Sequence, residues 1–531
     1  MKHSDPPLRQ VFPTWLAGSL LAAVIMVGSF YNLANYPTIW WDEGIFSETA
    51  ANLVQHGRYA FTVQSPDQLN DLDYRISVGP AVILPVALAY RLLGVALVPG
   101  RLVAGAYLVL AFLVLFLGAR RLWGPLTALG AIALALLGTD VFYWGRSVLG
   151  DIPGLALFLC GTWLLVKALE EVSLPSLFLG GLCLGLAFDA KEFYGLAFLP
   201  PLVILTIQSW GNKRQLVKRL LVYGLGVAVP LLAYLVLKWV ILGSLKPAVL
   251  HFFLQKKLLC HEFFTPFTIG RLYPESINYL LGHPLFWLAI FGACCLWKKE
   301  GTSFGEKLWI GNFLLWSLFY LTAVYWHRFA LPALFLASPL AAYFVGQALV
   351  RLTASLGRRP GWLAPGMLLA LMMVYPLPGV DYFAQIFKSR ADSPTRLVNY
   401  LHKHVPRECL IETPEYELAF LDDDHRMHLM PPFFFVESTP DRIVLLNPQQ
   451  EPYDFNRVGA DLLILGSFGK GVFKQVYSPA LLALGWRRIA QVDYYDIYAP
   501  QSRFPKPAPK NLVPSQSKAK ITHSRLKLVS P

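Results

Sequence analysis

Two adjacent carboxylates, Asp42 and Glu43, follow the first hydrophobic stretch of the chain and stand directly behind Trp40 and Trp41. Tryptophan is enriched at membrane–water interfaces, so we expect this pair where the chain leaves a bilayer. A carboxylate costs on the order of 2.5–3.5 kcal/mol at the centre of a membrane helix. An acidic pair at this depth therefore indicates chemistry on a substrate that is itself anchored in lipid.

The residues after the pair also allow a simpler interpretation. Ile45, Thr49 and Leu53 recur at helical spacing, which predicts an amphipathic helix on the membrane surface with Asp42 near its N-terminus. A carboxylate at that position can cap the helix, which is worth about 1 kcal/mol. Taken alone, the segment leaves capping and catalysis equally open for Asp42.

Ionisable residues elsewhere shift this balance, because they fall in the expected outer loops and would face the same side of the membrane. The candidate catalytic residues are Asp42, Glu43 and Asp151. The candidate ligands of a donor phosphate are Arg101, Arg146, Lys191, His327 and Arg328. The candidates for an acceptor or donor loop are Glu48, Arg75, His251, Lys257 and His261. For each cation, the alternative is a side chain that reaches from the apolar region to the interface.

A pocket with carboxylates and cations at the membrane surface suits a sugar carried on a polyprenyl phosphate. Transfer of the sugar requires a base that takes the proton of the acceptor hydroxyl, and cations that stabilise the departing phosphate. Asp42 would supply the base, and the arginine, lysine and histidine side chains would supply the positive charge. No nucleotide is needed for this reaction.

The composition of the 531-residue chain defines its class, because 55% of the residues are hydrophobic, 15% are charged, and the apolar residues form long uncharged blocks. This pattern predicts a polytopic helical membrane protein. The net charge of +13 arises from Lys and Arg clusters between the blocks and in the C-terminal tail, a pattern that membrane orientation requires and that does not indicate nucleic-acid binding. The six cysteines do not suggest a disulfide framework.

Membrane topology follows from placing the basic clusters on the cytoplasmic side, which requires an even number of crossings between successive clusters. Parity then excludes one apolar stretch, residues 79–97, which we expect to lie in the outer interface because it contains two prolines and an arginine. About eleven spans remain, with a cytoplasmic N-terminus and an extracytoplasmic C-terminal region. The expected spans are 14–33, 100–122, 124–144, 152–169, 176–189, 193–210, 219–242, 283–297, 308–326, 329–350 and 362–379.

The chain divides into three parts. Residues 1–380 form the multi-span domain, with long external loops at 34–99 and 243–282. Residues 381–500 have short or alternating apolar runs between turn signals, which predict an extracytoplasmic α/β domain. Residues 501–531 are basic, rich in proline and lacking apolar periodicity, so we expect a disordered tail.

Three weaker motifs lie in the predicted α/β domain. The run Gly466–Gly471 hints at a phosphate loop, but its spacing fails the required pattern, so a surface turn is favoured. The run Asp422–His428 could bind a cation, although a polar loop is the favoured interpretation. His402 and His404 are two residues apart, which is the wrong interval for a shared helical face.

Several short motifs, in order along residues 14–345, resemble the GT-C class of membrane glycosyltransferases, in particular dolichyl-phosphate-mannose protein mannosyltransferases and bacterial aminoarabinose transferases. The similar segments are Asp42-Glu43 with Glu48, Gly100-Arg101-Leu102, Arg120-Arg121-Leu122-Trp123-Gly124, Ser147-Val148-Leu149-Gly150-Asp151-Ile152-Pro153, Gly185-Leu186-Ala187-Phe188-Asp189-Ala190-Lys191 and His327-Arg328-Phe329-Ala330-Leu331-Pro332. The resemblance implies that Asp42 is the catalytic base or positions it, and that Asp151 supports the donor or acceptor site. It also implies that Arg101, Lys191 and Arg328 hold lipid phosphate.

One motif departs from the family. Aminoarabinose transferases carry Glu-Lys-Pro at the start of the interfacial helix, where this chain has Val78-Gly79-Pro80. The donor sugar and the acceptor, whether lipid, glycan or protein, therefore stay open. No cofactor is assigned from the sequence; a divalent cation is the candidate left open, and no metal ligands are assigned.

The leading hypothesis is an inverting transferase that uses a polyprenyl-phosphate monosaccharide at the outer face of a bacterial inner membrane. The alternatives are an oligosaccharide ligase that uses a lipid diphosphate and a transporter, or flippase, for lipid-linked sugars. The ligase would depend mainly on cations, whereas the transporter would carry charges deep within its spans.

Overall fold

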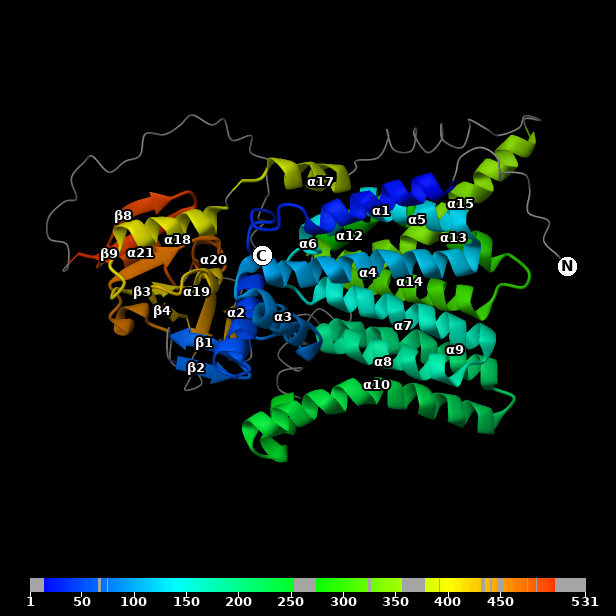
Figure 1. Ribbon diagram of the computed structural model, residues 1–531, viewed down its shortest axis with the longest axis horizontal. Helices are drawn as coiled ribbons and strands as arrows, with labels where there is room; N and C mark the ends of the chain where they lie inside the picture. The colour runs from blue at the N-terminus through cyan, green and yellow to red at the C-terminus, as the bar shows by residue number, and fades with distance from the viewer. Residues whose placement is uncertain are drawn as a thin grey trace.

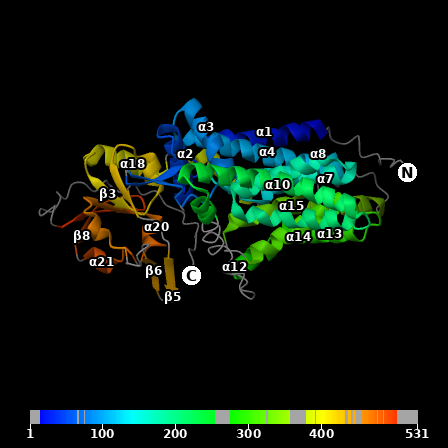
Figure 2. The same cartoon turned by 90° about the horizontal axis from the view of Figure 1, so that it is seen from below.

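The computed structural model describes two connected parts, a bundle of apolar helices and a mixed sheet with its own helices (Figure 1). Figure 2 shows the same arrangement from below, with the sheet beyond one end of the bundle. The description covers residues 14–501 with gaps at 65–67, 74, 253–273, 323–325, 356–377, 391, 431–434, 440–441, 447–452, 475 and 484.

Ten helices run roughly side by side and build the bundle. They are α1 (Thr14–Phe30), α4 (Leu97–Trp123), α5 (Pro125–Gly138), α7 (Asp151–Glu171), α8 (Leu174–Ala190), α9 (Leu199–Ser209), α10 (Lys213–Leu242), α13 (Pro284–Trp297), α14 (Phe304–Thr322) and α15 (Leu331–Ser355). Within the described residues, five helical segments are long and apolar enough to cross a membrane, or six if the bent pair at 274–297 is one span. The chain is thus a multi-pass membrane protein, as predicted, while the count of eleven spans stays a prediction. The expected span at 362–379 lies outside the described residues.

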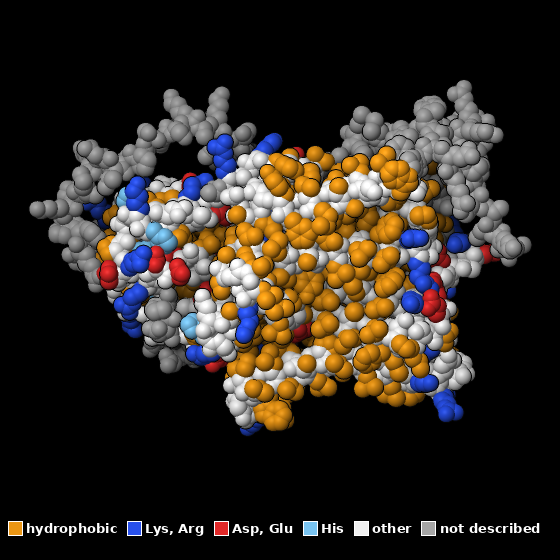
Figure 3. All heavy atoms as spheres, viewed as in Figure 1, with side chains coloured by type: hydrophobic (Ala, Val, Ile, Leu, Met, Phe, Trp, Pro, Cys, Tyr) orange, Lys and Arg blue, Asp and Glu red, His pale blue; other side chains and the backbone are white. Residues whose placement is uncertain are grey.

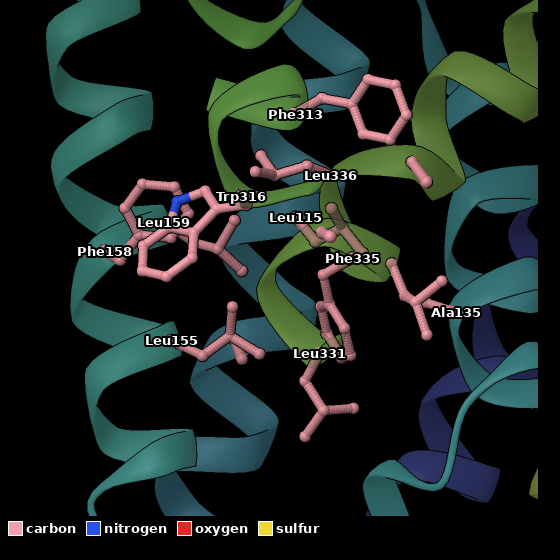
Figure 4. Packing of buried hydrophobic residues seen from close by; sticks show 14 of the residues in the cluster. Leu115, Ala135, Leu155, Phe158, Leu159, Phe313, Trp316, Leu331, Phe335 and Leu336 are labelled. Atoms are coloured by element: carbon pink, nitrogen blue, oxygen red, sulfur yellow. The ribbon is translucent and has the colours of Figure 1, made fainter. Parts of the chain in front are cut away.

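Large apolar side chains fill the centre of the bundle. Figure 4 shows Phe158 of α7 and Trp316 of α14 packed beside Phe335 and Leu336 of α15. The outer surface of the bundle is apolar as well, and Figure 3 shows hydrophobic side chains covering most of the face in view. Helices that are apolar on both their inner and outer faces are typical of membrane spans.

Helix α3 (Pro80–Leu93) lies at the sheet end of the bundle and has two different faces. Its Val82, Ile83 and Val86 are buried, whereas Leu88 and Leu92 are 58% and 71% exposed. Fourteen residues of helix span about 21 Å, which is short of a hydrocarbon core of about 30 Å. Length and amphipathicity therefore support the expected place of α3 at the interface, which stays a prediction.

The sheet has seven strands in the order β2-β1-β4-β3-β7-β9-β8. Its parallel centre consists of β4 (Arg426–Leu429), β3 (Leu410–Thr413) and β7 (Leu462–Leu465), and the remaining neighbours pair antiparallel. Two strands, β1 (Ala60–Gln64) and β2 (Gln68–Asp71), come from the first loop, and Gln64 pairs with His428. The sheet thus extends beyond residues 381–500, the range expected for the α/β domain.

The other elements connect or flank these two parts. They are α2 (Trp41–Gln55), α6 (Val141–Trp144), η2 (Glu192–Phe198), α12 (Pro274–Leu281), η4 (His327–Ala330), α17 (Pro378–Lys388), α18 (Ser393–His404), α19 (Glu417–Leu421), η5 (Phe455–Val458), α20 (Ser467–Lys470), α21 (Pro479–Ala483), β8 (Trp486–Val492), β9 (Tyr495–Pro500) and the separate hairpin β5 (Phe435–Thr439) with β6 (Arg442–Leu446).

Candidate active site

Asp42 lies in the first turn of α2, between the bundle and the sheet (Figure 1). The N-cap position of this helix is occupied by Trp40, and no side chain caps the helix. The carboxylate of Asp42 accepts a hydrogen bond from Nη2 of Arg328 at 2.9 Å. Capping, one of the two roles open from the sequence, is therefore excluded for Asp42.

Arg328 joins two of the predicted catalytic carboxylates. It lies in η4, and its Nη1 is 3.9 Å from Oδ2 of Asp151, the first residue of α7. Neither oxygen of Asp151 has a hydrogen-bond partner among the described residues, and the same holds for Nε and Nη1 of Arg328. Buried polar groups without partners are rare in folded proteins, so these atoms are candidates for contacts with a ligand.

Aromatic rings surround the Arg328 guanidinium, which is within 5.6 Å of the ring centroids of Trp144, Trp326 and Phe329. The side chain of Arg328 is only 6% exposed, while that of Asp42 is 17% exposed. Cation–π contacts strengthen when the cation is removed from water. The rings thus hold the guanidinium in place, with Asp42 as the more accessible partner.

Glu43 and Arg101 do not have the roles that we predicted for them, a catalytic carboxylate and a ligand of the donor phosphate. They form a bidentate ion pair with distances of 2.7 and 2.8 Å, and both side chains are fully buried. The remaining bonds go to backbone, from Arg101 to the Leu33 carbonyl and from the Val148 amide to Glu43. These contacts leave Arg101 no open side for a lipid phosphate, so the pair instead connects the Leu33 carbonyl and the Val148 amide to the start of α2.

Arg146 likewise does not bind a phosphate in the way we predicted. Its guanidinium is fully buried and donates to the backbone carbonyls of Gly28, Tyr31 and Tyr36. The last carbonyls of a helix lack partners within the helix, and a nearby cation satisfies them. Arg146 therefore closes the C-terminal end of α1 and fixes the turn that leads into α2.

Lys191 lies close to the Asp151 end of α7, next to the loop before α3. Its Nζ donates to Oγ of Ser77 at 3.1 Å, and its Cδ is 3.2 Å from the place that a Cβ at Gly150 would take. The side chain is 2% exposed. Asp189, two residues earlier, accepts a bond from the Ala81 amide and thereby holds the start of α3.

The predicted loop residues Glu48 and Arg75 contact the sheet. Glu48 accepts a bond from Oγ1 of Thr62 in β1, and burial raises the pKa of Glu48 to about 7. Arg75 pairs with Asp73 at 2.9 Å and donates to the Met430 carbonyl. Both residues thus connect the first loop to the sheet, and their hydrogen bonds in the described part of the chain do not include Asp42.

The two histidines of the candidate set that the structure describes lie apart from each other. His251 bridges Nζ of Lys238 and the Leu72 carbonyl, and burial together with the lysine charge lowers its pKa to about 4. His327 stacks on Tyr279 with ring centroids 4.0 Å apart. Lys257 and His261 lie outside the described residues.

Sequence reasoning missed two contributors to this region. Asp140 is 3% exposed, accepts a bond from Nε1 of Trp144, and interacts electrostatically with His327. Trp41 is stacked between Tyr416 and Phe468, with centroids 4.7 and 4.8 Å apart. No local motif marks Asp140, whereas the tryptophan pair had been interpreted only as a membrane anchor.

The glycine-rich turn at 466–469 does not act as a phosphate loop. Its amides of Gly466 and Gly469 donate to Oε1 of Glu415 at 2.8 Å, and the Phe468 amide donates to Oε2 at 3.3 Å. A carboxylate of the protein thus occupies the place that a phosphate would take. The weak motif is a structural turn, in agreement with the favoured interpretation of the sequence.

A family model matches part of the chain. Residues 77–239 match the family described as dolichyl-phosphate-mannose-protein mannosyltransferase. This segment runs from the loop before α3 to α10 and includes Arg101, Arg146, Asp151 and Lys191. A search of curated proteins returned no match.

Solved structures share the architecture of nearly the whole chain. ArnT from Cupriavidus metallidurans bound to undecaprenyl phosphate has a TM-score of 0.58 and 15% identity, over 91% of this chain and 97% of that chain. The archaeal oligosaccharyltransferase AglB from Archaeoglobus fulgidus, in complex with an inhibitory peptide and a dolichol-phosphate, has a TM-score of 0.59 and 12% identity, over 94% and 75%. The chain thus has the GT-C fold, and the family match and both neighbours support the predicted mannosyltransferase and aminoarabinose transferase-like family.

Proposed function

We propose that this protein transfers a monosaccharide from a polyprenyl-phosphate donor to an acceptor hydroxyl, with inversion at the sugar carbon. The observation that carries the proposal is the group of Asp42, Arg328 and Asp151, drawn from three separate parts of the chain. A base beside a cation with unused donors is what this reaction requires. The family match and the lipid phosphates bound by the two solved neighbours support the choice of donor.

In this mechanism Arg328 has two partners at once. Its planar guanidinium donates through Nη2 to Asp42, while Nε and Nη1 face the donor phosphate. The Asp42 carboxylate, held by this bond, accepts the proton of the acceptor hydroxyl. The bond between the sugar carbon and the phosphate oxygen breaks as the acceptor oxygen bonds to the opposite face of the carbon, and Arg328 stabilises the charge of the released phosphate.

We place the reaction on the extracytoplasmic side of the membrane. The basic clusters Arg120-Arg121, Lys213-Arg214 and Lys298-Lys299 lie at ends of α4, α10 and α13 that are remote from the sheet. Cytoplasmic loops carry an excess of Lys and Arg, so the sheet and Asp42 belong to the opposite face. This sidedness leaves the N-terminus in the cytoplasm and suits a lipid-linked donor, because no nucleotide is needed for the transfer.

The first prediction tests Asp42 in proteoliposomes supplied with radiolabelled polyprenyl-phosphate hexoses and pentoses. Asp42→Asn removes the base and should reduce the transfer rate by about 10²–10⁴-fold. Asp381→Asn changes an exposed carboxylate of α17 and serves as the matched control with unchanged transfer. A thermal unfolding measurement on both variants checks that they are folded.

Transfer by Asp42→Asn at the rate of the unchanged protein would remove Asp42 from the mechanism. The donor is tested separately by supplying a lipid-diphosphate oligosaccharide to the same proteoliposomes. Consumption of that donor alone would identify the ligase alternative. Movement of lipid-linked sugar across the membrane without transfer would identify the transporter.

A further inference from the structure

The sheet domain contains a group of side chains that the proposed reaction does not use. His402 of α18 and Asp422 and His425 of the loop before β4 place one donor atom each within 4.8 Å of one another. Nε2 of His402 is 3.1 Å from Oδ1 of Asp422, and Nδ1 of His425 is 2.8 Å from Oδ2. We propose that His402, Asp422 and His425 bind a zinc ion.

The hydrogen bonds of His425 favour a metal at this point. Its Nε2 is 3.2 Å from the Val405 carbonyl, which can only accept, so Nε2 carries the proton. In the neutral ring Nδ1 then has no proton and presents a lone pair. This lone pair faces a carboxylate oxygen of Asp422, which likewise has only lone pairs to offer. A cation between them removes this repulsion. Metal-binding histidines commonly donate their second ring nitrogen to a backbone carbonyl in this way.

The donor set and its spacing suit zinc. Two imidazole nitrogens and one carboxylate oxygen are common zinc ligands, and tetrahedral bonds of about 2.0 Å place ligand atoms about 3.3 Å apart. The separation of 2.8 Å between Nδ1 of His425 and Oδ2 of Asp422 is close to this value, and the three donor atoms all lie within 4.8 Å of one another. The fourth position falls to water or to Asp424, whose Oδ2 is 3.7 Å from Nε2 of His402.

The surroundings hold the ligands in place. Oδ1 of Asp422 accepts bonds from the amides of Asp424 and His425, which fix the carboxylate while leaving Oδ2 toward the histidine. Asp422 and His425 are fully buried, and His402 is 37% exposed, so the site opens to solvent on the side of α18. An ion can therefore enter without unfolding of the sheet.

A zinc ion at this position would tie together segments that are distant in sequence. Such an ion fixes α18 to the loop between α19 and β4, and α19 packs against α2, the helix that carries Asp42. The site is therefore structural, and its effect on catalysis is transmitted through α19. Sequence analysis marked only part of this group: the run Asp422–His428 was noted as able to bind a cation, whereas His402 was considered only together with His404.

The second prediction compares the zinc content of the full-length protein, with any histidine tag removed, after chelation and dialysis against micromolar zinc. The unchanged protein should hold one zinc ion per chain more than His402→Gln or Asp422→Asn. His404→Gln changes an exposed histidine on the same helix and should keep the full content. A zinc ion bound elsewhere in the protein would remain in all variants, so it does not affect the difference in zinc content between the unchanged protein and the variants. His402 is partly exposed, so its substitution should leave the protein folded.

Cobalt provides a second measurement on the same variants. Co²⁺ bound tetrahedrally by nitrogen and oxygen gives visible absorption that His402→Gln should abolish and His404→Gln should retain. Equal zinc content in all the variants would overturn the proposal. Absence of zinc from the unchanged protein would overturn it too.

Discussion

Single residues in this chain divide between those that face the reaction and those that hold it in place. Among the described residues, Asp42, Asp151 and Arg328 have polar atoms that are accessible or lack a hydrogen-bond partner. The polar atoms of Glu43, Arg101 and Arg146 instead form buried ion pairs and hydrogen bonds within the protein. The sequence could mark all six as ionisable residues near one membrane face. It could not separate them, because a guanidinium that binds a carbonyl and one that binds a phosphate look identical in sequence.

At the scale of a residue, Glu417 gives a prediction about pH. Burial and the neighbouring Glu415 raise the pKa of Glu417 to about 8, while Tyr495 donates to it. An acid whose folded pKa lies above its unfolded value of 4.5 stabilises the fold fully at low pH. That stability is lost as pH rises from about 4.5 through 8, by at most about 1.4 kcal/mol per pH unit.

The third prediction follows from this decrease of stability with rising pH. The unfolding temperature of the protein in detergent should fall between pH 5 and 8, and Glu417→Gln should make this fall shallower. Glu408→Gln, at a position outside the buried pair, is the control and should keep the full dependence. A dependence that Glu417→Gln leaves unchanged would mean that Glu417 is ionised in the folded protein across this range.

At the scale of elements, the position of Asp42 depends on close contact between α2 and α19. A Cβ added at Gly44 would lie 2.4 Å from Cα and 2.7 Å from the amide nitrogen of Glu417. The helices therefore touch through their backbones, and only glycine permits it. The sequence predicted α2 correctly as a helix after Trp41, but its partner lies about 370 residues later in the chain and no local pattern indicates such a contact.

The fourth prediction concerns Gly44→Ala. The methyl group must push α2 away from α19, and a shift of about 1 Å at a catalytic group can cost about 10²-fold in rate. We expect transfer to fall by that order and the unfolding temperature to drop. Gly224→Ala in α10 adds a methyl group with no neighbour within 4 Å and should preserve both. Full activity in Gly44→Ala would show that the α2–α19 contact does not position Asp42.

At the scale of the whole molecule, the bundle and the sheet are joined beside the candidate site. The stack of Tyr416, Trp41 and Phe468 places the residue before Asp42 between two rings of the sheet domain. Trp41 also donates through Nε1 to the Pro414 carbonyl at 2.8 Å. Composition predicted the two parts and their order correctly. It could not predict the junction, because a tryptophan at a membrane interface normally contacts lipid.

The fifth prediction tests this junction with Phe468→Ala. Loss of one ring leaves one side of Trp41 open and removes a stacking contribution of about 0.5–1.5 kcal/mol beyond the buried area. Amides of α2 should exchange hydrogen faster, while those of β7 keep their protection. Val472→Ala, at an exposed position in the same domain, is the control. Unchanged exchange in α2 would show that the stack does not stabilise this helix.

The pairing of Gln64 with His428 has a consequence for how the protein is made. Roughly 360 residues separate the two strands, and synthesis at about 5–20 residues per second takes about 20 to 70 s to cover that distance. During this interval the β1–β2 hairpin has one edge without its neighbour while most of the helices are still being inserted. The nascent first loop is thus exposed to wrong pairing until β4 emerges and covers that edge.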